Sequence, residues 1–406
     1  MFLATILLAT LPLGSADTPD LIVLKNGKEI ECRVLFEDAE TVVYTKKRKG
    51  KELPREEVES VQSVERSMAE FLEAFSKLPA DDVAGLLDLA SFCESRELFG
   101  EARNLNIRAL ILDPMNEAAW TKLGGVYSKR RGWRLRVRGR YLALEDLRER
   151  VSDWKNALEL PTAHFLIKTD LAPERALDIA IDVERAYKTF YDLLGSTMRL
   201  YPFDEVPELR IYANEDDYER PPSPGDVVWY AANANILHVN ATASSEVPYV
   251  VVSELSDLLF FNAFRRTVGR TGNVAPWARK GFSQAFGAAY RKDPGKASWD
   301  LSQPIISHFK MQAAAEDPLS LKEILRSSRM AYSDPNEGHL FSAQGYTLVY
   351  FLAHVDDGAL RSKFGEYLIS SVRGQGAATH FAKILDVDLG EFETRWYAYV
   401  REIAGM

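Results

Sequence analysis

The sequence has few cysteines, only Cys32 and Cys93 among 406 residues. They lie in segments that we assign to different modules, so both a disulfide and two buried free thiols are open from the sequence. A metal site built from cysteines alone is excluded, because such sites need more thiolates than this chain has.

An excess of positive charge is also missing. Lys and Arg number 50 against 59 Asp and Glu, which gives a net charge of -9 and argues against a general nucleic-acid binder. Beyond the N-terminus no stretch is long and apolar enough to cross a membrane, so we expect no transmembrane segment in the mature chain. The hydrophobic content of 46% is enough for buried cores, and the length suits two or three domains.

The first residues, MFLATILLATLPLGSA, are uncharged, mostly apolar and end in small residues. Gly14 and Ala16 fit the small-residue rule of secretory cleavage sites, and Asp17 would begin the mature chain. A single membrane anchor is the alternative, but the run is short for a span. We therefore expect a signal peptide at residues 1–16 and an exported protein, periplasmic or extracellular.

Residues 17–65 have the pattern of a small antiparallel β-barrel of the SH3-like or Sm-like kind. DLIVLK and EIECRVLF flank Asn26-Gly27, a strong signal for a two-residue hairpin turn. TVVYTK, ELP and VESVQSV supply further short strands, and KKRKGK between them is expected to be a solvated loop.

Residues 66–130 switch to helical periodicity. Helices expected near 82–95, 98–111 and 116–129 resemble a tetratricopeptide repeat, with Pro114 ending one helix and Trp120 filling an interface. Fewer than three repeats do not make a free-standing solenoid, so we expect a spacer that packs on a neighbouring domain, with a peptide-binding groove as the alternative.

Residues 131–157 are expected to be a connector. The overlapping stretch KRRGWRLRVRGR holds seven positive charges, and its arginines alternate as on one face of a strand. A solvated connector with local ion pairs and a site for a polyanion are both open.

Residues 158–406 begin with strands and end with helices, the order of an α+β domain. LELPTAHFLIKTDL is expected to form a strand and residues 173–195 a long amphipathic helix. Three short strands follow, in PELRIYAN, DVVWYA and NILHVNA, and after residue 248 the pattern is helical to the end.

Within the helical part, VVSELSDLLF places Ser253, Glu254 and Asp257 at positions i, i+1 and i+4. Residues four apart lie on one face of a helix. The zinc motif His-Glu-x-x-His has the same spacing, with two ligands and a glutamate that activates the metal-bound water.

A second stretch, PWARKGFSQAFGAAY from Pro276, follows this helix. Together the two resemble gluzincin-type metallopeptidases, and more closely the peptidase-MA-like domains of exported bacterial proteins. Matching positions of the second stretch are Trp277, Gly281, Phe282, Ala285, Phe286 and Tyr290, and LFSAQGYTLVYFLAHV and FETRWYAYVREI resemble later helices of the family. The resemblance spans residues 160–406 and implies a gluzincin-like domain.

The ligands of that family are replaced here. Ser253 and Asp257 stand at the two histidine positions, Lys280 stands at the ligand of the second helix, and Glu254 alone matches, at the general-base position. Serine is a poor zinc donor, and lysine offers only donors and a positive charge. We expect Asp257 and Lys280 to form an ion pair where zinc would lie, with Glu254 and Ser253 as possible members.

The histidines show no ligand spacing among themselves. They are His164, His238, His308, His339, His354 and His380. We therefore expect no metal ligand, no cofactor, and no catalytic residue beyond the vestigial Glu254. The function expected is that of an inactive pseudopeptidase that binds or scaffolds a peptide or protein, with a zinc-dependent or nonstandard gluzincin peptidase as the alternative.

Overall fold

The structure is a computed structural model, in which some segments are described and others are not. The described residues are 19–37, 39–46, 49–137, 140–198, 200, 202–203, 205–219, 226–268, 274–327 and 337–406. The expected signal peptide at residues 1–16 lies outside them.

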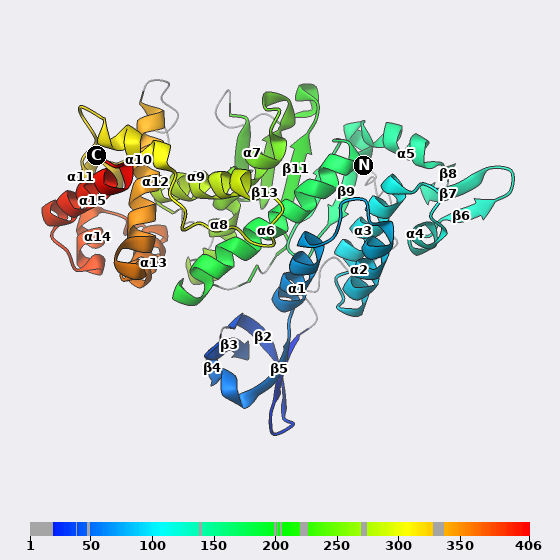
Figure 1. The fold of residues 1–406 in the computed structure, drawn as a ribbon, viewed down its shortest axis with the longest axis horizontal. Helices are drawn as coiled ribbons and strands as arrows, with labels where there is room; N and C mark the ends of the chain where they lie inside the picture. The colour runs from blue at the N-terminus through cyan, green and yellow to red at the C-terminus, as the bar shows by residue number, and fades with distance from the viewer. Residues whose placement is uncertain are drawn as a thin grey trace. The chain divides into compact units, whose positions relative to one another are not determined.

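The protein has an α+β fold, as the sequence predicts (Figure 1). Its chain divides into two compact units. The first unit comprises residues 1–188, 203–251 and 295–297, and the second comprises 189–202, 252–294 and 298–406. The module boundaries expected from the sequence stay a prediction.

The N-terminal sheet of the first unit has five antiparallel strands in the order β4-β3-β2-β1-β5. These are β1 (Asp20–Leu24), β2 (Glu29–Glu37), β3 (Thr41–Lys46), β4 (Lys49–Pro54) and β5 (Val58–Gln62). The hairpin predicted at Asn26-Gly27 is confirmed: Gly27 has a φ of 80°, and Val23 pairs with Glu29. Part of the expected KKRKGK loop is instead the start of β4, which pairs along β3 as far as Lys46.

Short helices follow this sheet. They are α1 (Val64–Ser76), α2 (Val83–Ser95), α3 (Phe99–Leu112) and α4 (Glu117–Lys122). Side chains of Ser63, Asp82 and Asn116 accept hydrogen bonds from backbone amides in the first turn of α1, α2 and α4, which fixes where these helices begin. The helix α3 packs on β9 (Leu158–Pro161) of the same unit.

The prediction of a helix over residues 116–129 is wrong beyond residue 122. Gly124 takes a φ of 78°, and the Gly125 amide donates back to the carbonyl of Trp120, which ends the helix. The chain then forms a three-stranded antiparallel sheet of β6 (Val126–Ser128), β7 (Gly132–Val137) and β8 (Arg140–Leu142), followed by α5 (Leu144–Val151). Part of the expected connector is therefore regular sheet.

A mixed sheet completes the first unit, in the order β12-β13-β11-β10-β9. Its strands are β9, β10 (Leu166–Thr169), β11 (Glu208–Tyr212), β12 (Val228–Ala231) and β13 (Ile236–Asn240). The expected single strand over LELPTAHFLIKTDL is two antiparallel strands, because Thr162 and Phe165 close a turn through hydrogen bonds with each other. The long helix α6 (Pro173–Met198) joins the parallel strands β10 and β11 and matches the helix predicted from the sequence.

The second unit is helical throughout its described part. Its helices, with α6 and α7 shared between the units, are α7 (Val247–Glu254), α8 (Ser256–Val268), α9 (Pro276–Lys292), α10 (Ile306–Ala313), α11 (Leu321–Arg326), α12 (Gly338–His354), α13 (Arg361–Val372), α14 (Ala378–Leu385) and α15 (Leu389–Ala404).

Two glycines lie where α9 and α12 cross at close range. A Cβ on Gly281 of α9 would lie 2.7 Å from the carbonyl oxygen of Gly345 on α12, and one on Gly345 would lie 2.9 Å from that of Trp277. Trp277 and Phe282 are buried beside this crossing. The glycine, tryptophan and phenylalanine of the second stretch therefore have a packing role in this chain.

By length and composition, one stretch in the described part, Val247–Phe264, is long and apolar enough to cross a membrane, which corrects the expectation that no such stretch follows the N-terminus; 67% of it is buried inside the protein. Burial of this kind is also what a core helix shows. Cys32 and Cys93 are both buried free thiols. Burial raises the pKa of Cys32 to about 12, so this thiol stays protonated near neutral pH.

Candidate functional site

The candidate site lies on α7, α8 and α9, but the first helix is not continuous. The helix α7 ends at Glu254 and α8 begins at Ser256, with Leu255 between the two helices. Ser253 and Asp257 therefore stand on either side of a helix break, which corrects the expectation of one helix through VVSELSDLLF. Glu254 is the last residue before that break.

Glu254 is held by two side chains of α9. The Lys280 ammonium lies 3.3 Å from Oε1 of Glu254, and the Ser283 hydroxyl donates to the same oxygen at 3.2 Å. Burial pushes the pKa of Glu254 upward, but the Lys280 charge and these hydrogen bonds outweigh it, so the pKa lies below its usual value. The carboxylate is thus ionised and neutralised by Lys280.

Asp257 has a different cation. Arg279 binds it through two guanidinium nitrogens, Nε to Oδ1 and Nη2 to Oδ2, and both side chains are less than one-fifth exposed. The expected Asp257–Lys280 pair is therefore wrong in its partners, although Lys280 does pair with an acid of this cluster. An arginine fork matches a carboxylate in two places at once, which a lysine ammonium does not.

Ser253 lies next to Glu254 and is buried, with 6% of its surface exposed. The Lys280 ammonium and the Ser283 hydroxyl of α9 both contact Oε1 of Glu254. Sequence reasoning missed both Arg279 and Ser283. Their positions in the sequence could have indicated them, because residues 279 and 283 are one helical turn apart on α9 and lie on either side of Lys280.

The donor set does not suit a divalent metal ion. The two carboxylates, Glu254 and Asp257, each already have a cationic partner, so the cluster of two acids and two bases carries no net charge. Lysine and arginine have no lone pair to donate while charged, and their charges repel a cation. Within the described ranges no group of three or more His, Cys, Asp and Glu side chains is arranged to hold a metal ion.

The histidines are engaged elsewhere. In the first unit, His238 stacks on Trp229 with ring centres 4.2 Å apart, and its Nδ1 lies 3.0 Å from the Tyr212 hydroxyl. In the second unit, His308 lies 3.2 Å from the Gln284 amide oxygen. None of these contacts brings a histidine to Glu254.

A second polar cluster, which the sequence did not reveal, lies inside the first unit. His164 is buried, and its Nδ1 lies 2.7 Å from Oε2 of Glu184 while its backbone amide donates to Oε1. Burial lowers the pKa of His164, but the Glu184 carboxylate more than offsets this and the pKa lies above its usual value.

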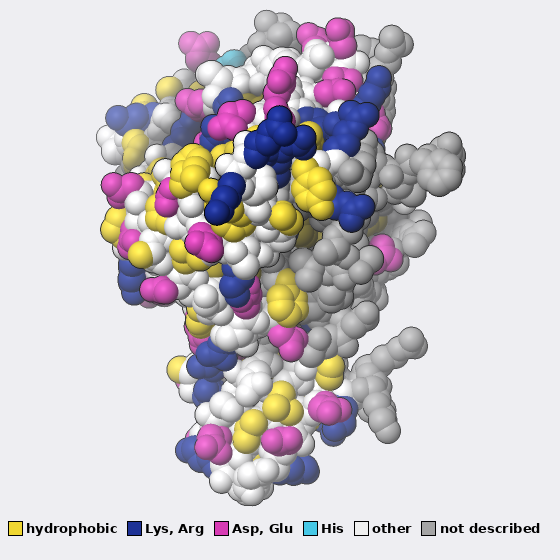
Figure 2. Space-filling view, turned by 90° about the vertical axis from the view of Figure 1, so that its right-hand side faces the viewer, with side chains coloured by type: hydrophobic (Ala, Val, Ile, Leu, Met, Phe, Trp, Pro, Cys, Tyr) yellow, Lys and Arg dark blue, Asp and Glu magenta, His cyan; other side chains and the backbone are white. Residues whose placement is uncertain are grey.

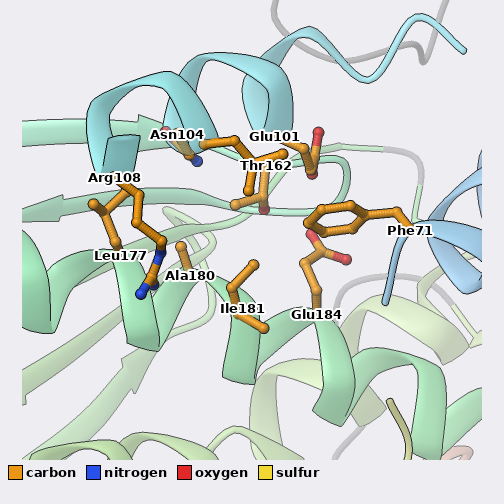
Figure 3. A pocket seen from close by; sticks show the side chains of 10 residues that line it. Phe71, Glu101, Asn104, Arg108, Thr162, Leu177, Ala180, Ile181 and Glu184 are labelled. Atoms are coloured by element: carbon orange, nitrogen blue, oxygen red, sulfur yellow. The ribbon is translucent and has the colours of Figure 1, made fainter. Parts of the chain in front are cut away.

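Glu101 on α3 completes this cluster. It accepts a hydrogen bond from the Ala163 amide at 2.6 Å, and Figure 3 shows it beside Phe71 in the same small cavity as Glu184 of α6. Burial, and then repulsion from Glu184, raise the pKa of Glu101 to about 8. Neither glutamate belongs to a motif, because only the packing of α3 on α6 brings them together.

No protein-family model matches the sequence, and no curated protein matches it. The resemblance to metallopeptidases therefore stays a prediction from the residues of the two stretches described above.

Proposed function

We propose that this protein is an exported, catalytically inactive relative of gluzincin-type metallopeptidases that binds or scaffolds a peptide or protein. The order of modules proposed is a small β-barrel at 17–65, tetratricopeptide-like helices at 66–130, a connector at 131–157 and a peptidase-MA-like domain at 158–406. The observation that carries the proposal is the pairing of Glu254 with Lys280 and of Asp257 with Arg279. Each carboxylate at a metal-site position is neutralised by a side chain that cannot bind metal.

Measurement of the zinc content of the full chain, purified without chelators, tests the proposal that the protein is an inactive relative of these peptidases. We expect far less than one zinc per chain by mass spectrometry of the metal content. About one zinc per chain would favour the alternative, a zinc-dependent or nonstandard peptidase. In that case, loss of peptidase activity in Glu254→Gln would identify the remaining carboxylate as the general base.

Restoration of the ligands tests the family resemblance itself. The triple variant Ser253→His, Asp257→His, Lys280→Glu would place two imidazoles and a carboxylate at the positions of the family's ligands. We expect it to take up about one zinc per chain. Its matched control, Ser253→His/Asp257→His/Arg279→Glu, keeps Lys280 and places the new carboxylate one residue away on α9. This control should bind zinc much more weakly. A folded triple variant that binds no better than this control would contradict the resemblance.

An edge strand supports the binding role. Among the described residues, β12 pairs with β13 on one side and with no strand on the other. A free strand edge can add an extended peptide through main-chain hydrogen bonds. Hydrogen exchange with and without a random peptide pool tests this: we expect slower exchange of the β12 amides with peptide present. Unchanged exchange in β12 would argue against peptide binding at this edge.

A further inference from the structure

The small sheet of β6, β7 and β8 has one face that is both basic and apolar. Val126 pairs with Arg134, and Tyr141 pairs with Arg136. Directly paired residues of antiparallel strands point to the same side of the sheet. These four side chains therefore share one face, which we call the basic hairpin face. Val126 is 51% and Tyr141 49% exposed.

The opposite face is anchored to the helices of the same unit. Trp133 of β7 stacks on Trp120 of α4, with ring centres 6.0 Å apart and planes within 6°. Leu135, on the same side as Trp133, is buried in the core of α1 to α4. This packing fixes the hairpin, so the basic hairpin face is turned away from the core.

Among the described residues, the exposed cations of this sheet have no acidic partner. Lys129, Arg130 and Arg131 in the first turn, with Arg136 and Arg140, are exposed and form no ion pair with any residue that the structure describes. Arg134 donates to the carbonyls of Arg131 and Tyr141. Arg148 of α5 pairs with Glu174 of α6, which is a pair between elements and not one of the local ion pairs expected from the sequence. Arg138 lies outside the described residues.

Figure 2 looks onto the side on which Figure 1 places these strands. It shows dark blue side chains of Lys and Arg gathered beside yellow apolar ones. This concentration of positive charge contrasts with the net charge of -9 of the whole chain. The positive potential is therefore local, and a partner that carries negative charge fits this face.

We propose that the basic hairpin face binds the headgroup region of a membrane rich in anionic phospholipids. Arginines bind lipid phosphates through paired hydrogen bonds. Tyrosine rings favour the interface between headgroups and acyl chains, where Val126 can also leave water.

The same residues suit a nucleic acid less well. Binding of single strands relies on exposed aromatic rings on which bases stack. The ring of Trp133 is instead covered by Trp120 and, with centres 5.3 Å apart, by Tyr127. A long polyanion would also extend beyond the hairpin onto a chain of net negative charge.

Vesicle sedimentation with the full chain tests the proposal. We expect binding to vesicles of phosphatidylglycerol mixed with phosphatidylcholine, and a loss of that binding at about 0.5 M salt. The variant Arg130→Glu/Arg136→Glu should bind these vesicles roughly 30-fold more weakly or worse. Arg130→Gln/Arg136→Gln, which removes the charge without reversing it, should show a smaller loss in the same direction.

The matched control is Lys28→Glu/Lys51→Glu, which makes the same change in charge at two exposed positions of the N-terminal sheet. It should bind like the unchanged protein. Vesicles of phosphatidylcholine alone report any binding by the apolar residues 1–16. Equal binding to both kinds of vesicle, or equal loss in the control variant, would overturn the proposal. Arginine-dependent binding to a single-stranded oligonucleotide without binding to anionic vesicles would overturn it as well.

Discussion

The ammonium nitrogen of Lys280 lies 3.3 Å from Oε1 of Glu254, so a lysine neutralises the carboxylate that stands at the general-base position of the zinc motif. Both side chains are about one-third exposed, so water also solvates the pair. The pair holds Glu254 ionised without making it a base that is free to take up a proton.

Removing that lysine should cost a modest amount of stability. We expect Lys280→Met to lower the free energy of unfolding by about 1 kcal/mol near neutral pH, because the ion pair is partly exposed. The pKa of Glu254 lies below its unfolded value, so this contribution is present above the unfolded pKa and is lost as pH falls through the folded pKa. Denaturant unfolding at neutral and acidic pH measures it.

The control for that variant is Lys292→Met, at an exposed position in the last turn of the same helix. It should change stability little at either pH. An effect of Lys280→Met that is the same at acidic and neutral pH would show that the ion pair is not its source.

Asp257 and Arg279 should be energetically coupled. Because both are largely buried and joined by two hydrogen bonds, a double-mutant cycle with Asp257→Asn and Arg279→Gln should give a coupling energy of about 1–2 kcal/mol. Thermal unfolding of the two single variants and the double variant supplies the cycle. The pair Asp257→Asn and Lys280→Met should show a much smaller coupling, and a larger one would support the pairing expected from the sequence.

Glu101 should make the protein less stable as pH rises. Its pKa is about 8 in the folded state and about 4.3 in an unfolded chain, so folding takes up a proton between these values. The raised pKa of His164 acts in the same direction, since its stabilising charge is lost as pH rises. We therefore expect the melting temperature to fall between about pH 5 and about pH 8.

Glu101→Gln should reduce this slope, because the amide keeps an acceptor for the Ala163 amide and does not ionise. Relative to the unchanged protein, the variant should gain at least about 1 kcal/mol on going from pH 5 to pH 8. Glu117→Gln, at an exposed position of α4, is the control and should leave the slope as it is. An unchanged slope in Glu101→Gln would mean that Glu101 is already ionised at pH 5.

The crossing of α9 and α12 should tolerate no methyl group. A Cβ on Gly281 would lie 2.5 Å from Cγ2 of Val349 as well as close to the Gly345 carbonyl. We expect Gly281→Ala to destabilise the protein by about 1–3 kcal/mol. Gly390→Ala at the start of α15, where the nearest atom would be Asp388 Oδ1 at 3.3 Å, should be neutral or stabilising in the same melting experiment.

Local signals in the sequence determined much of the secondary structure. The hairpin at Asn26-Gly27, the helices α2 and α3 and the length of α6 follow from turn chemistry and apolar periodicity, which act within a few residues. Apolar periodicity alone misread residues 123–129, because Gly124, with a φ of 78°, ends the helix and the packing of Trp133 on Trp120 then holds the strand that follows.

For the candidate site, too, the sequence determined some features and the tertiary structure determined others. The sequence by itself determined which residue types stand at the four positions of the zinc motif, and hence that they make a poor donor set for zinc. Only the tertiary structure decided that Lys280 pairs with Glu254 and Arg279 with Asp257, and that Glu101 meets His164 and Glu184. The physical reason is that ion pairs depend on distances of a few ångström between separate helices, which spacing along one chain does not specify.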